Sequence, residues 1–579
     1  MNVARRPCLG LAWQAAREPL LAAAFALAVF WPVQQFGFLA LDDDRFVWAN
    51  PVVRTGLSSQ LVRWAFTTTE QGHYQPLTWL THAADVSAFG LDPGAHHRTN
   101  LALHALATAL CCIAFSRLTG RRDVGLVTAL LYAAHPSRIE VVAWVAERKD
   151  LVSACFFFGA LWAWGAERRA VTLGLYTLAL LAKPIALPLP LLLLLLTFAP
   201  LAPAGARRHI RADLRWLAPG LVLMLAFAAL AMFAQRSAGA MQPPGAIDPG
   251  RAAVHLWAYF GRALWPTGVS ILHPLKAVPF SVGLAALAAL AVAGVFALHQ
   301  VWRRPSLVAT GFCWAALLLL PVCGLVQIGA QSIADRWLLL PLAGLTAALA
   351  LLLPAGRVRL AVGVAAAGLA SVGTRAQLHT FESSEAVFTR ALELDADNPL
   401  VLVNLGTLYE LRGEVARAQK SYRQAVALNP RSALAANNLG SLAGQAGRLD
   451  EAKRWLERAL EAEPTFAPAH LNLARVLWLE GRLDLALPHY TSAARFAPLS
   501  AAAALGHGAA LLARRRPQEA RLELERAVEL DPSDAEAWAT LARARGASGD
   551  VRGAEDARAR VHALPNSPPL AFVEKHSSD

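Results

Sequence analysis

Three consecutive carboxylates, Asp42, Asp43 and Asp44, follow the first long apolar run of this chain. A carboxylate drawn into the centre of a bilayer costs about 2.5 to 3.5 kcal/mol, so an acidic triplet in this place belongs at the membrane surface. There it is available to deprotonate an acceptor group. The triplet is equally explained as a hydrated loop or a helix cap.

Further polar side chains lie in the loops between later apolar runs. Together they supply carboxylates and cations on one side of a membrane, as needed to deprotonate an acceptor and to hold a phosphate leaving group. Taken singly, each is also explained as a helix end or a snorkelling cation. These residues are Tyr74, His96, His97, Asn100, His104, His135, Glu140, Arg148, Lys149, Asp150, Lys183, Asp335 and Arg336. His97 and His104 stand two helical turns apart without an evident third ligand, which disfavours a zinc site.

The elements that must position these residues are membrane helices. The chain has 579 residues, of which 56% are hydrophobic and only 16% charged, a balance far from that of soluble proteins. At about 20 apolar residues per span, we count about eleven candidates. They lie at 19–40, 98–116, 124–136, 151–165, 170–182, 185–203, 216–234, 280–299, 306–326, 337–354 and 359–374. Several are short, so neighbouring helices must shield them.

The net charge of +13 reports topology and not nucleic-acid binding. Nearly the whole surplus lies in arginine clusters that follow every second apolar run, which places those loops in the cytoplasm. The clusters are Arg5, Arg6 and Arg17; Arg117, Arg121 and Arg122; Arg168 and Arg169; Arg207, Arg208, Arg211 and Arg215; Arg303 and Arg304; and Arg357 and Arg359. With an odd number of spans, a cytoplasmic N-terminus puts the acidic triplet and residues 375 onward on the opposite face. Five of the six cysteines fall in apolar runs, so no disulfide framework is indicated.

The polar C-terminal part repeats every 34 residues. Pro430, Pro464, Pro498 and Pro532 end successive units. Small residues recur at 406, 440, 474 and 508, and glycines at 413, 447, 481 and 549, with Arg515 breaking the second series. A bulky residue precedes each in-phase alanine by three positions: Phe388, Tyr422, Leu456, Tyr490 and Leu524. This is the tetratricopeptide (TPR) pattern of paired helices, which stack into a solenoid whose concave surface binds peptides or partner proteins.

The sequence therefore predicts an all-α chain made of a polytopic helix bundle and a TPR solenoid. The predicted domains are a transmembrane domain at 1–374, a TPR array of about four full and some partial repeats at 375–566, and a C-terminal tail at 567–579.

Several strings in the membrane half resemble bacterial TPR-bearing membrane proteins that are related to the eukaryotic transmembrane TPR O-mannosyltransferases. The strings are 41–50 (LDDDRFVWAN), 74–77 (YQPL), 96–104 (HHRTNLALH), 135–150 (HPSRIEVVAWVAERKD), Lys183-Pro184 and 334–337 (ADRW). The resemblance implies a GT-C glycosyltransferase fold and a polyprenyl-phosphate-linked sugar as donor. It also implies a bacterial inner-membrane enzyme that acts outside the cytoplasm on an exported protein.

The resemblance also assigns roles to residues. It implies Asp42 and Asp43 as the acidic pair, one of them the general base toward a Ser or Thr hydroxyl, and the pair as ligands of a divalent cation, Mg or Mn. Asp44 is a less certain third member. Arg148, Lys149, Lys183 and Arg336 become candidates for the donor phosphate, and Glu140 for orienting sugar or acceptor. Gln75 stands where the resemblance expects a basic residue, so no basic role is carried over to that position.

Three interpretations stay open at this point. The first is a lipid-linked glycosyltransferase with the TPR array presenting an acceptor protein, and the second is a membrane-anchored TPR scaffold for envelope or secretion complexes without catalysis. The third is a glycosyltransferase whose acceptor is a lipid or polysaccharide. The charged groups around a membrane cavity disfavour a pure scaffold. A transporter is disfavoured because no pair of interrupted, repeated spans is visible.

Overall fold

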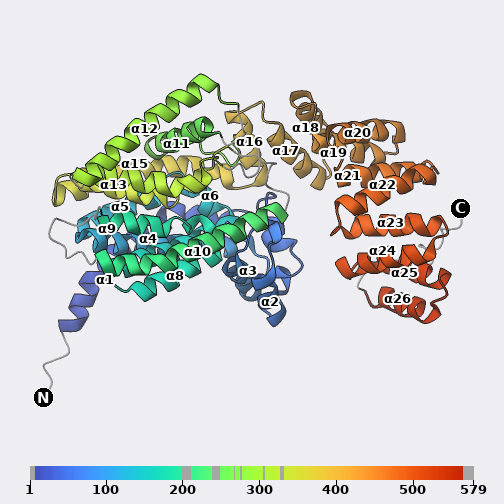
Figure 1. Ribbon diagram of the computed structural model, residues 1–579, viewed down its shortest axis with the longest axis horizontal. Coiled ribbons are helices and arrows are strands. Elements are labelled where there is room, and N and C mark those ends of the chain that lie inside the picture. Colours follow the sequence, from blue (N-terminus) through green and yellow to red (C-terminus); the bar gives the residue numbers. More distant parts are fainter. Residues whose placement is uncertain are drawn as a thin grey trace, which may run out of the picture. The chain divides into compact units, whose positions relative to one another are not determined.

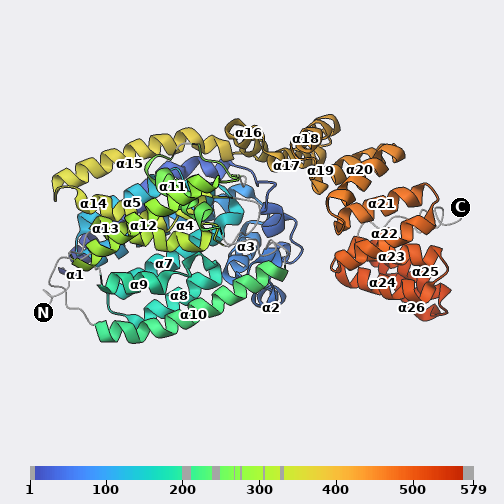
Figure 2. The same ribbon diagram turned by 45° about the horizontal axis from the view of Figure 1, so that its top comes forward.

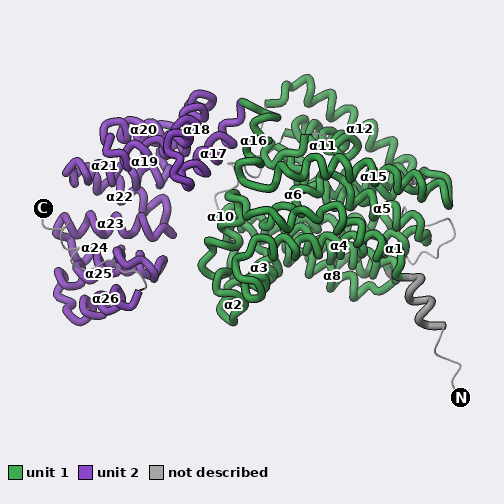
Figure 3. Tube along the Cα trace, turned by 180° about the vertical axis from the view of Figure 1, so that it is seen from behind, with its two compact units in different colours: residues 1–396 green, residues 397–579 purple. Residues whose placement is uncertain are grey.

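The protein is all-helical in the residues that its computed structural model describes, which are 7–198, 210–237, 248–266, 268–273, 277–303, 307–325 and 332–564. The chain forms two compact units, Met1–Ala396 and Asp397–Asp579 (Figure 3). The first unit includes the helix at Ser384–Leu394, which packs with it. The predicted tail and the arginines at 5, 6, 207, 208 and 304 lie outside the described residues.

The first unit is a bundle of helices joined by short helical turns (Figure 1). Its helices are α1 (Pro7–Phe30), α2 (Ser59–Thr67), α3 (Pro76–Phe89), α4 (Pro93–Thr119), α5 (Arg122–Ala134), α6 (Arg138–Ala143), α7 (Arg148–Gly165), α8 (Arg169–Ala182), α9 (Leu189–Phe198), α10 (Ile210–Ser237), α11 (Pro249–Leu264), α12 (Phe280–Arg303), α13 (Leu307–Leu319), α14 (Pro341–Leu352), α15 (Arg357–Leu378) and α16 (Ser384–Leu394). The turns are η1 (Trp31–Gln35), η2 (Asp44–Trp48), η3 (Val53–Thr55), η4 (Glu70–Gly72), η5 (Val145–Glu147), η6 (Pro184–Ala186), η7 (Leu320–Val322), η8 (Asp335–Leu338) and η9 (His379–Phe381).

In its described residues, each predicted apolar segment overlaps one of these helices. Among the described residues, five helical segments are long and apolar enough to cross a membrane: Ala16–Gln35, Pro93–Thr119, Asp213–Ser237, Phe280–Gln300 and Arg357–Phe381. Shorter apolar helices in the first unit are Arg169–Ala182, Pro184–Phe198, Val308–Val322 and Pro341–Leu352. The chain is thus a membrane protein, and the number of spans stays a prediction.

Helix α4 forms the centre of the bundle. Half of its most apolar stretch is buried inside the unit, against 17% for α10 and 11% for α12. In Figure 2, α10 and α15 run along opposite sides of the unit with α4, α5 and α7 between them. The outer helices expose apolar side chains such as Val222, Phe233 and Val292, as expected for surfaces that face lipid. The short helices α5 and α7 pack directly on α4.

Capping side chains set the starts of the helices that lead to the site. Asp92 accepts hydrogen bonds from the backbone amides of Gly94 and Ala95, and Pro93 takes the first position of α4. Pro76 takes the same position in α3. Proline suits this position because its missing N–H would be unpaired there in any case. The polar residues that follow these prolines are therefore presented at defined places on each helix.

The second unit is a stack of antiparallel helix pairs, as the 34-residue period predicts. Its helices are α17 (Pro399–Leu411), α18 (Val415–Leu428), α19 (Ala433–Gln445), α20 (Leu449–Ala462), α21 (Ala467–Leu479), α22 (Leu483–Phe496), α23 (Ala501–Ala513), α24 (Pro517–Leu530), α25 (Ala535–Ala547) and α26 (Val551–Ala563). Within each pair, a small residue meets a bulky one. A side chain added at Gly406 would lie 2.5 Å from the ring of Tyr422, and one at Gly440 would lie 2.6 Å from Leu456. Close approach of the paired helices therefore requires the small residues.

The turn between paired helices adopts a left-handed backbone. The backbone angle φ is 74° at Gly413, 72° at Gly447 and 74° at Gly481. Arg515, which interrupts the glycine series, keeps the same conformation at φ 57°. The repeat geometry therefore imposes a left-handed backbone on Arg515. This conformation costs free energy for a residue with a side chain but not for glycine.

Arg515→Gly should relieve this cost. We expect the local free energy of opening of α23 and α24 to rise by about 1 kcal/mol. Hydrogen–deuterium exchange on the purified chain in detergent measures it. Gly481→Ala, at an equivalent turn, should lower protection of α21 and α22, and equal protection in all three proteins would contradict the explanation.

Candidate active site

Asp43 is a fully buried carboxylate that joins two distant segments. Its Oδ2 accepts a hydrogen bond of 2.8 Å from the amide of Leu39, and its Oδ1 accepts one of 2.7 Å from the amide of Ala146. The segment after α1 is thereby held against the connection between α6 and α7. Burial raises the pKa of Asp43 to about 7 against the opposing effect of these two hydrogen bonds.

Its neighbours are placed differently. Asp42 is partly exposed, and its carboxylate makes no hydrogen bond or ion pair with any residue that the structure describes. Asp44 begins η2, and its buried Oδ1 has no hydrogen-bond partner among the described residues. Asp42 and Asp44 are both partly exposed, but one oxygen of Asp44 is buried, so the carboxylate of Asp42 is the more open to an acceptor.

Glu147 is the centre of a buried cluster of three cations. Its Oε2 lies 2.9 Å from Nζ of Lys183, and its Oε1 lies 3.2 Å from Nζ of Lys149 and 3.6 Å from Nε of Arg336. Lys183 also pairs with Asp150 at 2.8 Å. Three of the four cations that the sequence proposed for a phosphate are thus brought together from α7, the α8–η6 turn and η8.

The opposite charges in the cluster stabilise one another. Burial alone would raise the pKa of Glu147, but Lys149, Lys183 and Arg336 outweigh it and hold that pKa well below its ordinary value. Burial likewise opposes the charge of Lys183, yet Asp150 and Glu147 raise its pKa above the ordinary value. Glu147 and Lys183 are therefore ionised at neutral pH, whereas burial raises the pKa of Asp150 to about 7.

The cation cluster lies beside the acidic loop. The Nζ of Lys149 stands 4.4 Å from the ring centroid of Phe46, which belongs to η2 directly after the acidic triplet. Ala146, the amide donor to Asp43, immediately precedes Glu147. A carboxylate open to an acceptor and a cation cluster suited to a phosphate are therefore built on adjoining residues.

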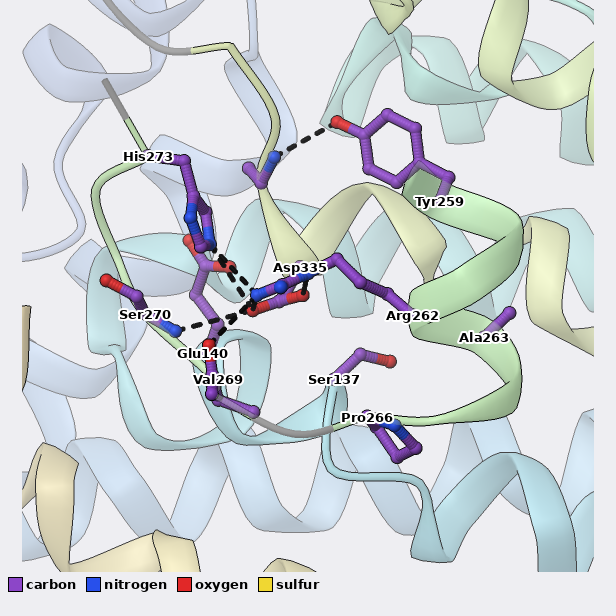
Figure 4. Close-up of polar contacts among 12 residues, drawn as sticks. Ser137, Glu140, Tyr259, Arg262, Ala263, Pro266, Val269, Ser270, His273 and Asp335 are labelled. Atoms are coloured by element: carbon purple, nitrogen blue, oxygen red, sulfur yellow. Dashed lines mark hydrogen bonds and ion pairs between the residues drawn. The ribbon is translucent and has the colours of Figure 1, made fainter. Parts of the chain in front are cut away.

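Two carboxylates hold the η8 turn, which carries Arg336. Glu140 pairs with its guanidinium and accepts a 2.8 Å hydrogen bond from its backbone amide. The preceding residue of η8, Asp335, pairs with Arg262 at 2.6 Å and lies 3.8 Å from His273 (Figure 4). Glu140 therefore orients a cation. Although burial raises the pKa of Asp335, His273 and Arg262 bring it below its ordinary value, so its charge is retained.

Arg148 and Asn100 lie in a separate buried network. The guanidinium donates to Oδ1 of Asn100 at 2.8 Å and to the carbonyls of Thr81 and His96, and it pairs with Asp85 at 2.6 Å. These partners tie α7 to α3 and α4. The structure therefore gives Arg148 a positioning role away from the three clustered cations.

The remaining proposed pocket residues are dispersed. His97 contacts the carbonyl of Gly37 at 3.2 Å, and Tyr74 donates to the carbonyl of Phe66. His104 packs between the rings of Phe30 and Tyr132, and His135 contacts Ser137 and the carbonyl of Ala263. None of these four contacts the cation cluster in the described structure.

Sequence reasoning passed over Glu147, Asp85, Arg262 and His273. Glu147 stands within the string 135–150, and its signal was an acidic residue directly before Arg148 and Lys149 in an otherwise apolar stretch. No comparable signal marks Arg262 or His273, because their partner Asp335 lies more than 60 residues away along the chain. Their pairing emerges only from the fold.

The acidic pair does not fit a closed metal site. Both oxygens of Asp43 already accept backbone hydrogen bonds, and no group of three or more His, Cys, Asp or Glu side chains in the described part of the chain is arranged to hold a metal ion. Within the described residues, Asp42 and Asp43 therefore do not form a site for a divalent cation by themselves.

The first unit also ties α16 to the acidic loop. The amide of Ala40 donates to Oγ of Ser384 at 2.7 Å, and the amide of Gly37 donates to the carbonyl of Glu382 at 3.4 Å. Leu39, between them, donates to Asp43. The helix that precedes the repeat stack therefore braces the segment that carries the acidic pair.

The chain is similar to tetratricopeptide repeat proteins and to a family of transferases. The tetratricopeptide repeat family matches residues 375–433, 403–468, 437–504 and 477–544, so this region consists of TPR repeats. Protein O-mannosyl-transferase TMTC1 of Homo sapiens is 34% identical over 169 residues, which are 27% of this chain and 18% of that protein. Its Drosophila melanogaster counterpart, Tmtc1, is 30% identical over 115 residues, 20% of this chain and 12% of its own length.

The chain thus spans less than a fifth of the length of these curated relatives. Among solved structures, the TPR protein YrrB, described as having an unusual peptide-binding site, is 23% identical over 33% of this chain and 97% of its own. The TM-score is 0.28.

The pKa of Asp43 predicts a pH-dependent stability. Because its folded-state pKa of about 7 lies above the ordinary 3.8, the folded protein holds a proton between these values that the unfolded chain has released. The carboxyl's contribution to stability therefore falls as pH rises through this window. We expect the melting temperature in detergent to fall more steeply from about pH 5 to about pH 8 in the wild type than in Asp43→Asn.

Asp43→Asn should also melt lower at every pH, because an amide group would face one backbone N–H with another donor. Asp450→Asn, an exposed change in the second unit, is the control. Parallel pH profiles for wild type and Asp43→Asn would contradict the assignment of this pKa.

Proposed function

We propose that this chain is a membrane glycosyltransferase that moves a sugar from a polyprenyl-phosphate carrier to a Ser or Thr hydroxyl of an exported protein. The observation that carries the proposal is the junction at Asp43, which joins the open carboxylate of Asp42 to a buried cluster of three cations. A general base and a site for an anionic leaving group are the two parts that such a displacement needs.

Asp42 is the general base. Its carboxylate takes the proton of the acceptor hydroxyl as the oxygen attacks the anomeric carbon of the sugar. The bond between that carbon and the phosphate oxygen breaks, and the lipid phosphate leaves with the bonding electrons. Attack on the face opposite the leaving group inverts the anomeric configuration. Asp43 holds the loop in place and does not itself contact the acceptor, since its oxygens face backbone amides.

Lys149 and Lys183 hold the phosphate, with Arg336 beside them. An ammonium has three donors, and Lys183 directs two of its own at Glu147 and Asp150. Lys149 has one ion-pair partner, Glu147, within the described residues. Both lysines thus retain donors for a phosphate oxygen. The three carboxylates keep the cations buried and charged while no donor is bound.

The arrangement of charge along the chain supports a site outside the cytoplasm. The arginine clusters alternate with the loops that hold Asp42, Glu147 and Lys183. A bacterial inner membrane with the TPR array on its outer face is the location that this proposal implies.

The TPR repeats support a protein as the acceptor. TPR solenoids bind peptides and partner proteins on their concave surface. The names of the relatives support mannose as the sugar and protein as its acceptor. A lipid or polysaccharide acceptor would leave the repeat array without a part in the reaction.

Asp42→Asn tests the proposal directly. We expect transfer of mannose from polyprenyl-phosphate-mannose to protein to fall by about 100-fold or more, because the base is lost. The melting temperature should stay unchanged, because this carboxylate has no partner among the described residues. Lys149→Met should slow transfer as well, and Lys420→Met, at an exposed lysine of the second unit, is its control. Full activity in Asp42→Asn would overturn the proposed mechanism.

Ending the chain after Ala396 tests the role of the repeats. The first unit keeps α16 and its contacts with the acidic loop. We expect the shortened chain to release free mannose from the lipid donor but to lose transfer to protein. Undiminished transfer to protein would exclude a presenting role, and transfer to lipid or polysaccharide by both chains would favour the third reading.

A further inference from the structure

One face of α3 carries polar side chains that are completely buried. Gln75, at the start of the helix, Trp79 and His82 are each 0% exposed. Gln75 is the residue that precedes the helix, and Trp79 and His82, three residues apart within α3, lie on the same side of it. Both amide atoms of Gln75, the indole nitrogen of Trp79 and both ring nitrogens of His82 have no hydrogen-bond partner in the described part of the chain.

Such atoms are rare in folded proteins. A buried donor or acceptor without a partner forfeits the hydrogen bonds that it had with water, so nearly all buried polar groups in native structures are paired. Five such atoms at the start and on one side of α3 lack the partners that a polar molecule, either water or a ligand, would supply. Apolar residues would pack there at less cost if the face served packing alone.

The surroundings have the chemistry of a sugar site. Phe46 stacks on Trp79 with ring centroids 4.8 Å apart, and Trp64 meets Trp79 edge-on at 5.0 Å. Oδ1 of Asp44, in the same η2 turn as Phe46, is also buried without a partner among the described residues. Sugars present hydroxyls that both donate and accept, together with apolar C–H faces. Aromatic rings beside groups that donate and accept hydrogen bonds match both features of a sugar.

The face also adjoins the phosphate cations. The hydroxyl of Thr78, in the first turn of α3, donates to the carbonyl of Ala182 at 2.9 Å, directly before Lys183. Lys149 stands 4.4 Å from the ring centroid of Phe46, whose ring stacks on Trp79. A group that occupies this face therefore has phosphate-binding cations close by.

We propose that this face of α3 binds the hexose of the lipid-linked donor, with Gln75 and His82 hydrogen-bonded to sugar hydroxyls. The proposal rests on the proposed function and adds the sugar to the phosphate site. Gln75 supplies one donor group and one acceptor, which suits neighbouring hydroxyls. Burial, with the charge of Arg148, keeps the pKa of His82 well below its ordinary value, so its ring is neutral and also offers one donor and one acceptor.

Gln75→Leu separates ligand binding from packing. Since the amide has no protein partner, its replacement by an apolar side chain of similar size should leave the melting temperature unchanged or raise it. We expect binding of polyprenyl-phosphate-mannose to weaken by about 10-fold, the effect of one or two lost hydrogen bonds, with binding of sugar-free polyprenyl phosphate unchanged. His82→Leu should behave in the same way. Gln60→Leu, at an exposed glutamine of α2, is the matched control.

Lys149→Met should weaken binding of both lipids, because it removes a phosphate contact. The sugar site is overturned if Gln75→Leu and His82→Leu bind both lipids as the wild type does, since water alone would then pair these atoms. The sugar site is also overturned if the two variants lose affinity for both lipids by the same factor. A wild type that binds the two lipids equally well rejects the sugar site alone, whereas one that binds neither rejects the proposed function with it.

Discussion

The carboxylate of Asp43 is the link on which the site depends. Its hydrogen bonds to the amides of Leu39 and Ala146 close a connection across more than 100 residues of chain. One end of this connection sets the position of Asp42, and the other sets that of Glu147 and the cations around it. A buried carboxylate is costly unless its oxygens are hydrogen-bonded, so the same bonds that place the loop also permit the burial.

Charge balance is the second constraint on this region. Glu140, Glu147 and Asp150 face Lys149, Lys183 and Arg336, so three carboxylates oppose three cations in a buried place. Without these partners the cations could not remain charged at the edge of a bilayer. The cluster still leaves donors on the lysines. It therefore preserves a site that favours an anion.

Much of this was predictable from the sequence. Repeat spacing and side-chain size fixed the helix pairs of the second unit, because each glycine is needed where Tyr422 or Leu456 packs. The apolar runs located the membrane helices, and alternation of charge grouped Lys149, Lys183 and Arg336. The sequence did not distinguish the roles of adjacent residues. Arg148 and Lys149 begin the same helix but belong to different networks, because successive side chains on a helix point about 100° apart. Segments far away in sequence determine which aspartate is buried and which cations pair with Glu147.

The most direct test of the account is the stoichiometry of a single reaction. The purified full-length chain in proteoliposomes is given labelled polyprenyl-phosphate-mannose and an exported acceptor protein, and protein-linked mannose and free polyprenyl phosphate are measured together. We expect both products in equal amounts, with the anomeric configuration inverted. A donor that remains intact would contradict catalysis and leave a membrane-anchored TPR scaffold as the explanation of the chain.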